Sequence, residues 1–441
     1  MMSGSRFPEL NLYFLEQKVG TIIFENERQC YLVYDGEWIH HGFVISPHLT
    51  FNTAIDSVAT SRFIQNLFPE GSAFECLIEL QNLSKYNLYA ILKTIGHDTA
   101  GALSFLKTEP NSETVLRLVT QKELIERLKD GSRKNLAFWD GKFRLSVAGV
   151  QNKLNVFCDE TGQFFLADGG YASTHILKFS STRFPNIVLN EFFSMRFAKA
   201  VSLPAAQVDL ISIGHFRALK VKRFDRKRAK NTVQKRHMID GCQALNLPPE
   251  SKYEQNFGSS KDVANIREGV SLSKLFEFAN RTSVPAQTKQ HLLDWILFNL
   301  IVGNSDAHGK NISFYIGKNG ISLAPFYDIV SVVFEHQENS DIDINLAMAI
   351  DDNFDINQIR VYDLISLAET IGFNFSLLKR RLERMLKTCT EQLERLRFEQ
   401  LSRDEENCLE QYKFLIRERI SYFVSELEQF DDVYASNFYS K

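Results

Sequence analysis

Two polar side chains five residues apart, followed by a third at the end of an apolar run, are the part of the chain best suited to chemistry. Asp306 and Asn311 lie within residues 303–311, Gly-Asn-Ser-Asp-Ala-His-Gly-Lys-Asn, and Asp328 ends a later Pro-Phe-Tyr-Asp segment. A carboxylate can accept the proton of an attacking hydroxyl, and carboxylate and amide oxygens bind hard cations such as Mg²⁺. These residue types predict phosphoryl transfer, in which a protein mainly positions groups and neutralises charge. A polar surface loop is the alternative.

Protein kinases use the same order and spacing for this chemistry. In that scheme Asp306 meets the substrate hydroxyl, while Asn311 and Asp328 hold metal ions that bridge the phosphates. Asp328 could instead cap the next helix. His308 is expected to shape the loop by hydrogen bonding, because no other His or Cys lies at ligand spacing. Lys310 either neutralises charge on the transferred phosphoryl group or faces solvent.

A lysine and a small-residue turn upstream could bind nucleotide phosphates. Lys178 lies in a predicted strand, on the face opposite Leu177 and Phe179, and could reach the phosphates as a point charge. Glu191, thirteen residues further on in a predicted helix, is its expected partner. Small side chains would let backbone N–H groups of the turn approach phosphate oxygens; the turn comprises Ser146, Val147, Ala148, Gly149 and Val150. A surface lysine and an ordinary turn are the alternatives.

Composition limits the class of protein. The chain has 441 residues, 44% of them hydrophobic and 24% charged, with a formal net charge of -3, so nothing global favours nucleic acid or membrane binding. The six cysteines show no Cys-x-x-Cys pair, which argues against zinc or a disulfide framework and fits a reducing compartment. No apolar run reaches the length of a membrane span. We therefore expect a cytoplasmic protein with no membrane contact.

The order of predicted elements indicates an α+β protein with two lobes. Strands and helices alternate in the first half, and the chain is mostly helical from about residue 262. We expect an N-terminal α/β subdomain at 1–110, the nucleotide-binding part of the N-lobe at 111–245 and a helical catalytic C-lobe at 246–441. The segment 222–236 carries eight basic residues and one acid. It is expected to be a solvated loop, with contact to a phosphate-bearing partner as the alternative.

Taken together, these segments resemble the HipA family in the same order along nearly the whole chain. That family comprises serine/threonine protein kinases that act as toxins of bacterial toxin–antitoxin pairs. The resemblance is carried by the segments 66–71, 96–102, 146–153, 174–179, 190–192, 221–226, 303–311, 325–329 and 346–348. It implies a bilobal protein-kinase-like fold with ATP and Mg²⁺ as cofactors.

The resemblance also implies a role for each matching position. Asp306 resembles the catalytic base, with Asn311 and Asp328 as metal ligands, and Lys178 the phosphate-binding lysine. The turn from Ser146 to Val150 resembles the loop over the nucleotide phosphates, and Ser146 the serine whose autophosphorylation expels that loop and silences the kinase. The remaining implied nucleotide neighbours are Arg223, Phe224 and His308.

The implied substrate is an aminoacyl-tRNA synthetase, and the implied partner is a small HipB-like DNA-binding antitoxin. Two positions depart from the family. Lys222 stands where some members have Glu beside the nucleotide, and Ile239 stands where a neighbouring acid is expected. The family's DNA-facing basic residues cannot be placed in 335–355, so contact with DNA is expected only through the antitoxin. Two other functions stay open: a catalytically silent subunit of a repressor complex, and a kinase of a lipid or small molecule.

Overall fold

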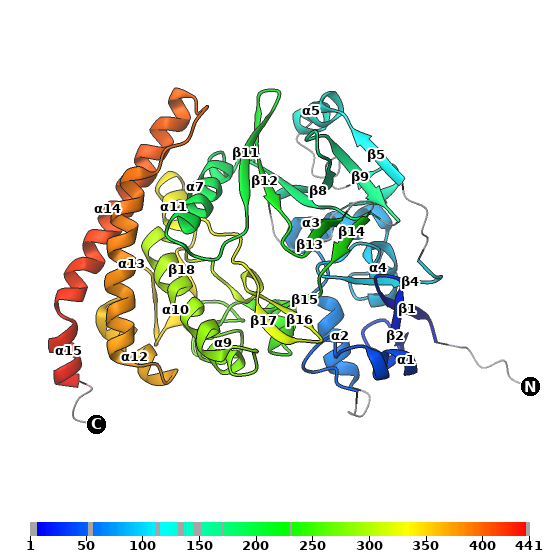
Figure 1. Ribbon diagram of the computed structural model, residues 1–441, viewed down its shortest axis with the longest axis horizontal. Helices are drawn as coiled ribbons and strands as arrows, with labels where there is room; N and C mark the ends of the chain where they lie inside the picture. The colour runs from blue at the N-terminus through cyan, green and yellow to red at the C-terminus, as the bar shows by residue number, and fades with distance from the viewer. Residues whose placement is uncertain are drawn as a thin grey trace, which may run out of the picture. The chain divides into compact units, whose positions relative to one another are not determined.

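A computed structural model describes residues 7–51, 56–110, 115–130, 136, 138–144, 151–169, 171–229 and 232–437. The chain forms two compact units, which we call the strand-rich unit and the helical unit. The strand-rich unit comprises Met1–Ser181, Asp209–Pro249 and Ser313–Ala324, and the helical unit Thr182–Val208, Glu250–Ile312 and Pro325–Lys441. This division confirms the expected α+β fold with two lobes (Figure 1).

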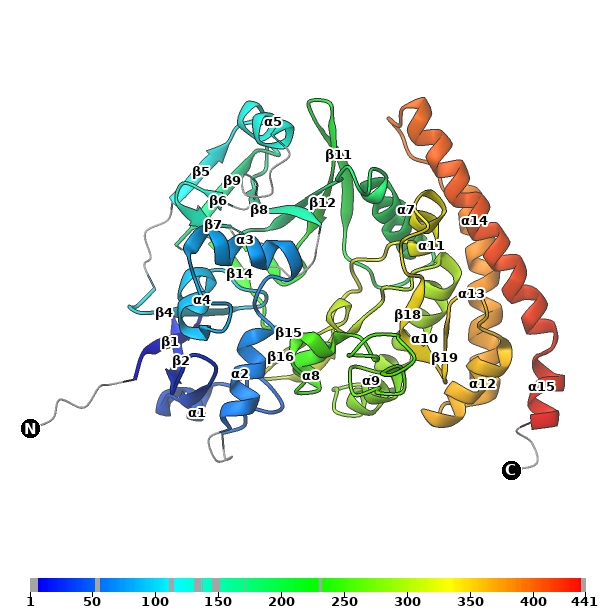
Figure 2. The same ribbon diagram turned by 180° about the vertical axis from the view of Figure 1, so that it is seen from behind.

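The strand-rich unit contains two large antiparallel sheets. The four-stranded sheet has the order β3-β2-β1-β4, and the six-stranded sheet the order β11-β12-β10-β8-β9-β5. Figure 2 shows α2 (Ser57–Gln65) and α4 (Leu88–Ile95) against the four-stranded sheet. The strands are β1 (Glu9–Phe14), β2 (Gln17–Phe24), β3 (Cys30–Tyr34), β4 (Leu103–Leu106), β5 (Val115–Val119), β8 (Asn152–Cys158), β9 (Phe164–Asp168), β10 (His175–Phe179), β11 (Val208–Ile213) and β12 (Phe216–Lys222).

Smaller elements complete this unit. The unit also contains the helices α1 (Gly36–His41), α3 (Gly71–Gln81), α5 (Gln121–Lys129) and the short α8 (Gly241–Ala244). Three further sheets are formed by β6 (Phe138–Trp139) with β7 (Lys142–Phe143), β13 (Arg226–Ala229) with β14 (Thr232–Lys235), and β15 (Met238–Asp240) with β16 (Ser313–Gly317) and β17 (Gly320–Leu323). The β13–β14 hairpin corrects the expectation of a solvated loop at 222–236, because Arg223 and Arg226 in this segment are buried.

The helical unit consists mainly of long helices. Figure 1 shows α13 and α14 running side by side. A capping box of Ser402 and Glu405 starts α14, since each side chain bonds the other residue's backbone N–H. The elements are α7 (Ile187–Ala200), α9 (Leu272–Ala279), α10 (Pro285–Val302), α11 (Val332–Glu338), α12 (Val361–Thr370), α13 (Phe375–Arg395), α14 (Arg403–Glu428), α15 (Phe430–Asn437), β18 (Asn345–Ile350) and β19 (Asn353–Asp355).

The core of the six-stranded sheet shows how strand alternation places Lys178. Leu177 and Phe179 belong to a buried cluster with Leu154, Val156 and Trp139. Successive side chains of a strand point to opposite faces, so Lys178 faces away from this core. None of the helices in the described ranges has the length and hydropathy of a membrane span.

Candidate active site

The loop that carries Asp306 starts at the end of helix α10. Pro285 occupies the first turn of that helix, where its missing N–H costs nothing. Gly303 ends the helix with φ +75°, a left-handed conformation that glycine adopts without strain. The Asn304 amide donates to Asn299 Oδ1 at 2.8 Å. The helix end therefore fixes where the loop leaves the helical unit's core.

Hydrogen bonds within the loop fold it back on itself, and two of them end at the Asp306 carbonyl oxygen. That oxygen accepts the backbone N–H of His308 at 2.9 Å and the Asn311 Nδ2 at 2.9 Å. The backbone N–H of Asn311 donates to the His308 carbonyl at 2.9 Å. The five-residue spacing of the aspartate and the asparagine is therefore a structural unit, in which the amide of one residue holds the main chain of the other.

The side chain of Asp306 is exposed, as a base that meets a substrate must be. Its Oδ1 accepts the Tyr253 hydroxyl at 2.9 Å. The Tyr253 ring also packs edge-on against the imidazole of His308, with 5.2 Å between ring centroids and 88° between planes. Tyr253 thus touches two residues predicted to act on the nucleotide or the acceptor.

Lys310 and His308 are buried, with 5% and 7% of their surface exposed. A solvent-facing Lys310, one of the two alternatives, is therefore wrong. Between them, Gly309 packs so closely on Val270 that an added Cβ would lie 2.5 Å from Val270 Cγ2. Within residues 303–311 only Asp306 is exposed and Ala307 is partly exposed, while the others are buried, so the alternative of a polar surface loop is also wrong.

Asp328 follows a stretch that is anchored on both sides. The Phe326 N–H donates to the Pro204 carbonyl at 2.8 Å, and its ring stacks on Trp295 at 5.6 Å. The Tyr327 hydroxyl donates to the Lys310 carbonyl at 2.6 Å. The neighbour of Asp328 is thereby bonded to the neighbour of Asn311, which joins the two predicted metal-binding segments.

The backbone of Asp328 itself turns sharply, with φ +59°. Aspartate tolerates this left-handed conformation better than most residues. Helix α11 is capped by Ser331, whose hydroxyl accepts the Phe334 N–H at 3.2 Å. The helix-cap alternative for Asp328 is therefore wrong.

The donor set of these two segments fits a hard divalent cation. The amide nitrogen of Asn311 is held by the Asp306 carbonyl, so its Oδ1 is the atom left to face a ligand. Asp328 supplies a carboxylate from the segment that the Tyr327 hydroxyl bonds to the Lys310 carbonyl. Oxygen ligands of this kind, few in number, suit Mg²⁺, which keeps several waters and phosphate oxygens in its shell. Among the residues the structure describes, no group of three or more His, Cys, Asp and Glu side chains could hold a metal.

Lys178 lies in β10, inside the six-stranded sheet, and is 8% exposed. Its partner across the strand pair is Lys153 of β8, which is 3% exposed. Strand alternation puts both lysine side chains on the face opposite Leu177 and Phe179. The pair therefore makes this face of the sheet a suitable place for phosphate oxygens, and burial argues against the alternative of an ordinary surface lysine.

His175 belongs to the same strand as Lys178, but strand alternation points it to the opposite face of the sheet. Burial, with Lys220 and Lys222, lowers the pKa of His175 to about 4. The imidazole of His175 is therefore neutral at pH 7 and adds no charge on its side of the sheet.

Glu191 is 1% exposed in α7 of the helical unit. The preceding residue, Asn190, accepts the Ser331 N–H at 2.9 Å and donates to the Ser331 carbonyl at 2.9 Å, so this part of α7 is fixed to the segment after Asp328. Lys178 belongs to the other unit, and its pairing with Glu191 stays a prediction.

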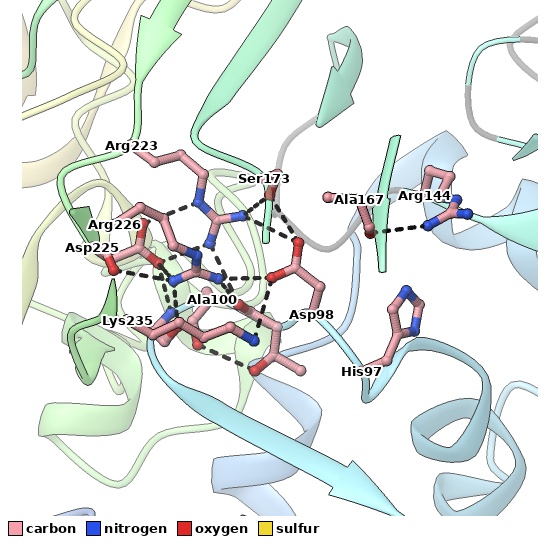
Figure 3. A network of polar contacts seen from close by, with 12 residues as sticks. His97, Asp98, Ala100, Arg144, Ala167, Ser173, Arg223, Asp225, Arg226 and Lys235 are labelled. Atoms are coloured by element: carbon pink, nitrogen blue, oxygen red, sulfur yellow. Dashed lines mark hydrogen bonds and ion pairs between the residues drawn. The ribbon is translucent and has the colours of Figure 1, made fainter. Parts of the chain in front are cut away.

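Arg223 takes part in a buried ionic network of the strand-rich unit (Figure 3). Its guanidinium donates to both carboxylate oxygens of Asp225, at 3.0 and 2.8 Å, and to Ser173 Oγ at 2.8 Å. Only 2% of its side chain is exposed. A nucleotide contact by Arg223 would therefore come from the backbone.

The adjacent Phe224 contacts Tyr315 of strand β16. Its carbonyl accepts the Tyr315 hydroxyl at 3.0 Å, and its ring packs edge-on against that of Tyr315 at 6.1 Å. Burial raises the pKa of the Tyr315 hydroxyl to about 12, so the donor keeps its proton.

The turn predicted to cover the phosphates, Ser146 to Val150, lies outside the described residues.

Two residues of this arrangement were not found from the sequence. Tyr253 lies more than fifty residues before Asp306, in a segment with no periodicity that would single it out. Lys153 follows the small-residue turn closely in the sequence. Its position opposite Lys178 depends on the register between β8 and β10, which local patterns do not give.

Comparisons with known proteins agree with this geometry. Residues 145–396 match the model of the HipA-like C-terminal domain, and residues 10–106 that of the HipA N-terminal domain. A Shewanella oneidensis protein named serine/threonine-protein kinase toxin HipA is 38% identical over 98% of this chain and 100% of its own length. The chain belongs to the HipA family.

A second relative and a solved structure add to this match. A protein of Sinorhizobium fredii named putative kinase Y4mE is 34% identical over 76% of this chain and 78% of its own. The solved Shewanella oneidensis HipA, from a complex described as HipA, HipB and operator DNA, matches with a TM-score of 0.86 over 96% of this chain and 99% of its own, at 38% identity. This HipA homologue is thus a serine/threonine-protein kinase by family, with a kinase-like fold.

Proposed function

We propose that this HipA homologue is an active kinase that uses ATP and Mg²⁺, and that it acts as the growth-arresting toxin of a toxin–antitoxin pair. One observation carries this proposal. The side-chain amide of Asn311 donates to the Asp306 carbonyl, while the Asp306 carboxylate is exposed. The hydroxyl of Tyr327, which precedes Asp328, donates to the Lys310 carbonyl of the same loop. A catalytically silent protein would have no need to keep this arrangement together with a buried Lys178.

Each residue has a distinct role in the proposed reaction. The acceptor serine or threonine oxygen forms a bond to the γ-phosphorus of ATP as the bond to the β-phosphate oxygen breaks and ADP leaves. Asp306 takes the acceptor's proton, and Lys178 neutralises phosphate charge. Asn311 and Asp328 would hold Mg²⁺, which supplies charge neutralisation on the phosphates when bound.

The substrate and partner are proposed from the family. We expect the substrate to be an aminoacyl-tRNA synthetase, whose phosphorylation would stop translation in the cytoplasm. The Shewanella oneidensis relative was solved in a complex with HipB and operator DNA. A HipB-like antitoxin is the corresponding partner here, with DNA contacted only through it.

Regulation is proposed at Ser146, on the sequence alone. A phosphate there would place about two negative charges beside those of the nucleotide, so the phosphorylated loop would leave the site. The form phosphorylated at Ser146 is expected to bind ATP more weakly than the unmodified chain. Equal affinity of the two forms would contradict this mechanism.

Incubation with γ-labelled ATP and Mg²⁺, alone and in a cell extract, tests the function. We expect labelled serine or threonine in the wild-type chain or in an extract protein identified by mass spectrometry. Asp306→Asn is the control, because the exposed carboxylate contributes little packing and the variant should fold while labelling nothing. A wild-type chain that labels no protein would favour the silent subunit, and a labelled lipid or small molecule would favour a different kinase class.

A further inference from the structure

A tyrosine hydroxyl occupies one oxygen of the predicted catalytic carboxylate. The Tyr253 hydroxyl donates to Asp306 Oδ1 at 2.9 Å, and both residues belong to the helical unit. Among the described residues, no other hydrogen bond to the Asp306 side chain is found, so Oδ2 is left for a second partner. The tyrosine thus fixes the plane of the carboxylate without blocking both of its oxygens.

The main chain on both sides of this hydrogen bond is tied to one residue of strand β18. The Ala347 N–H donates to the Ser305 carbonyl at 2.8 Å, and the Ala347 carbonyl accepts the Glu254 N–H at 2.9 Å. Ser305 precedes Asp306, and Glu254 follows Tyr253. The distance between the tyrosine and the aspartate is therefore set by a shared backbone partner rather than by two mobile side chains.

A buried carboxylate strengthens this attachment. Glu254 is 4% exposed, and its Oε2 accepts the Ala349 N–H at 2.9 Å while its Oε1 accepts the Arg267 Nε at 2.8 Å. The segment around Tyr253 also packs tightly against Gly269, because a Cβ at Gly269 would lie only 1.7 Å from the Tyr253 carbonyl oxygen. Tyr253 is 36% exposed, but the backbone around it makes these hydrogen bonds and close contacts.

We propose that Tyr253 is a positioning residue for phosphoryl transfer. Its hydroxyl holds Oδ1 of Asp306 so that Oδ2 faces the acceptor hydroxyl and takes its proton as the oxygen–phosphorus bond forms. Its ring packs against His308, which the family resemblance predicts to lie near the nucleotide. The inference rests on the proposed kinase function and adds to it a residue outside the aspartate–asparagine segment.

Two substitutions at one position separate the hydroxyl from the ring. Tyr253→Phe removes the donor and keeps the contact with His308, so the rate of self-labelling at saturating ATP and Mg²⁺ should fall about 10- to 100-fold, the loss expected for one hydrogen bond to a charged group. The Kd of a fluorescent ATP analogue should not change. Tyr253→Ala also removes the ring, so we expect the same fall in rate together with a higher Kd.

The matched control is Tyr362→Phe, which deletes a tyrosine hydroxyl from a side chain that is 44% exposed on α12 and should leave both quantities at wild-type values. Thermal unfolding of all variants checks that they are folded. A rate for Tyr253→Phe equal to or above that of the wild type would overturn the inference, since the hydroxyl would then be idle or inhibitory. A wild-type chain with no labelling at all would instead overturn the kinase proposal, and this inference with it.

Discussion

Neutralising one carboxylate of the buried ionic network should destabilise the strand-rich unit strongly. Asp98 lies 2.8 Å from Arg226 Nη2 and 2.8 Å from Ser173 Oγ, with Arg223 and Lys235 each 3.9 Å away (Figure 3). Although burial alone would raise the pKa of Asp98, these cations hold it well below its usual value. The carboxylate is therefore charged at pH 7.

The magnitude follows from the charge count. Three cations, Arg223, Arg226 and Lys235, face two carboxylates, Asp98 and Asp225, so the network carries one excess positive charge. Asp98→Asn raises this excess to two in a site that water hardly reaches. Removing one partner from a buried ion pair costs about 3–5 kcal/mol, and we expect the free energy of unfolding to fall by that amount.

Urea unfolding followed by tryptophan fluorescence measures this change, because Trp38 and Trp139 both lie in the strand-rich unit. Glu16→Gln is the control, since it neutralises an exposed carboxylate of the same unit. The double variant Asp98→Asn, Lys235→Met restores an excess of one charge and should recover part of the loss. A change below about 0.5 kcal/mol for Asp98→Asn, the range of ordinary surface substitutions, would refute this account of the network.

Three further predictions concern pH, packing and metal. Burial is the main cause that lowers the pKa of Lys235 to about 8; Arg226 and Arg223 also lower it, while Asp98 acts in the opposite direction. The unfolded chain then binds more protons between pH 8 and the ordinary lysine pKa of about 10.4, so the stability of the wild type should rise with pH across that window; Lys235→Met should abolish the rise in pH-dependent urea unfolding. Gly309→Ala places a Cβ against Val270, and should cost about 1–3 kcal/mol by thermal or chemical unfolding, whereas the same change at the open Gly317 should cost less. Asp328→Asn should raise the Mg²⁺ concentration needed for half-maximal labelling, with little effect on the unfolding midpoint; an unchanged Mg²⁺ requirement would remove Asp328 from the metal site.

Much of the fold could be predicted because local patterns agreed with it. The strand predicted to carry Lys178 is β10, and the helix predicted to carry Glu191 is α7. Periodicity and helix-ending residues carry this information within a few residues of sequence. The pairing of β1 with β4, about ninety residues away, is a long-range contact that no local pattern reports.

The candidate site divides in the same way. The sequence alone determined the chemistry: the types and spacing of Asp306, Asn311, Asp328 and Lys178 are local facts, and they predicted a phosphoryl-transfer family that the comparisons confirmed. Tertiary structure decided what surrounds these groups. Tyr253 reaches Asp306 because both neighbours bond to Ala347, and Arg223 is enclosed by carboxylates rather than open to a ligand. The physical reason is that hydrogen-bond partners and burial depend on which distant segments pack together, and a residue's own neighbours in sequence do not specify them.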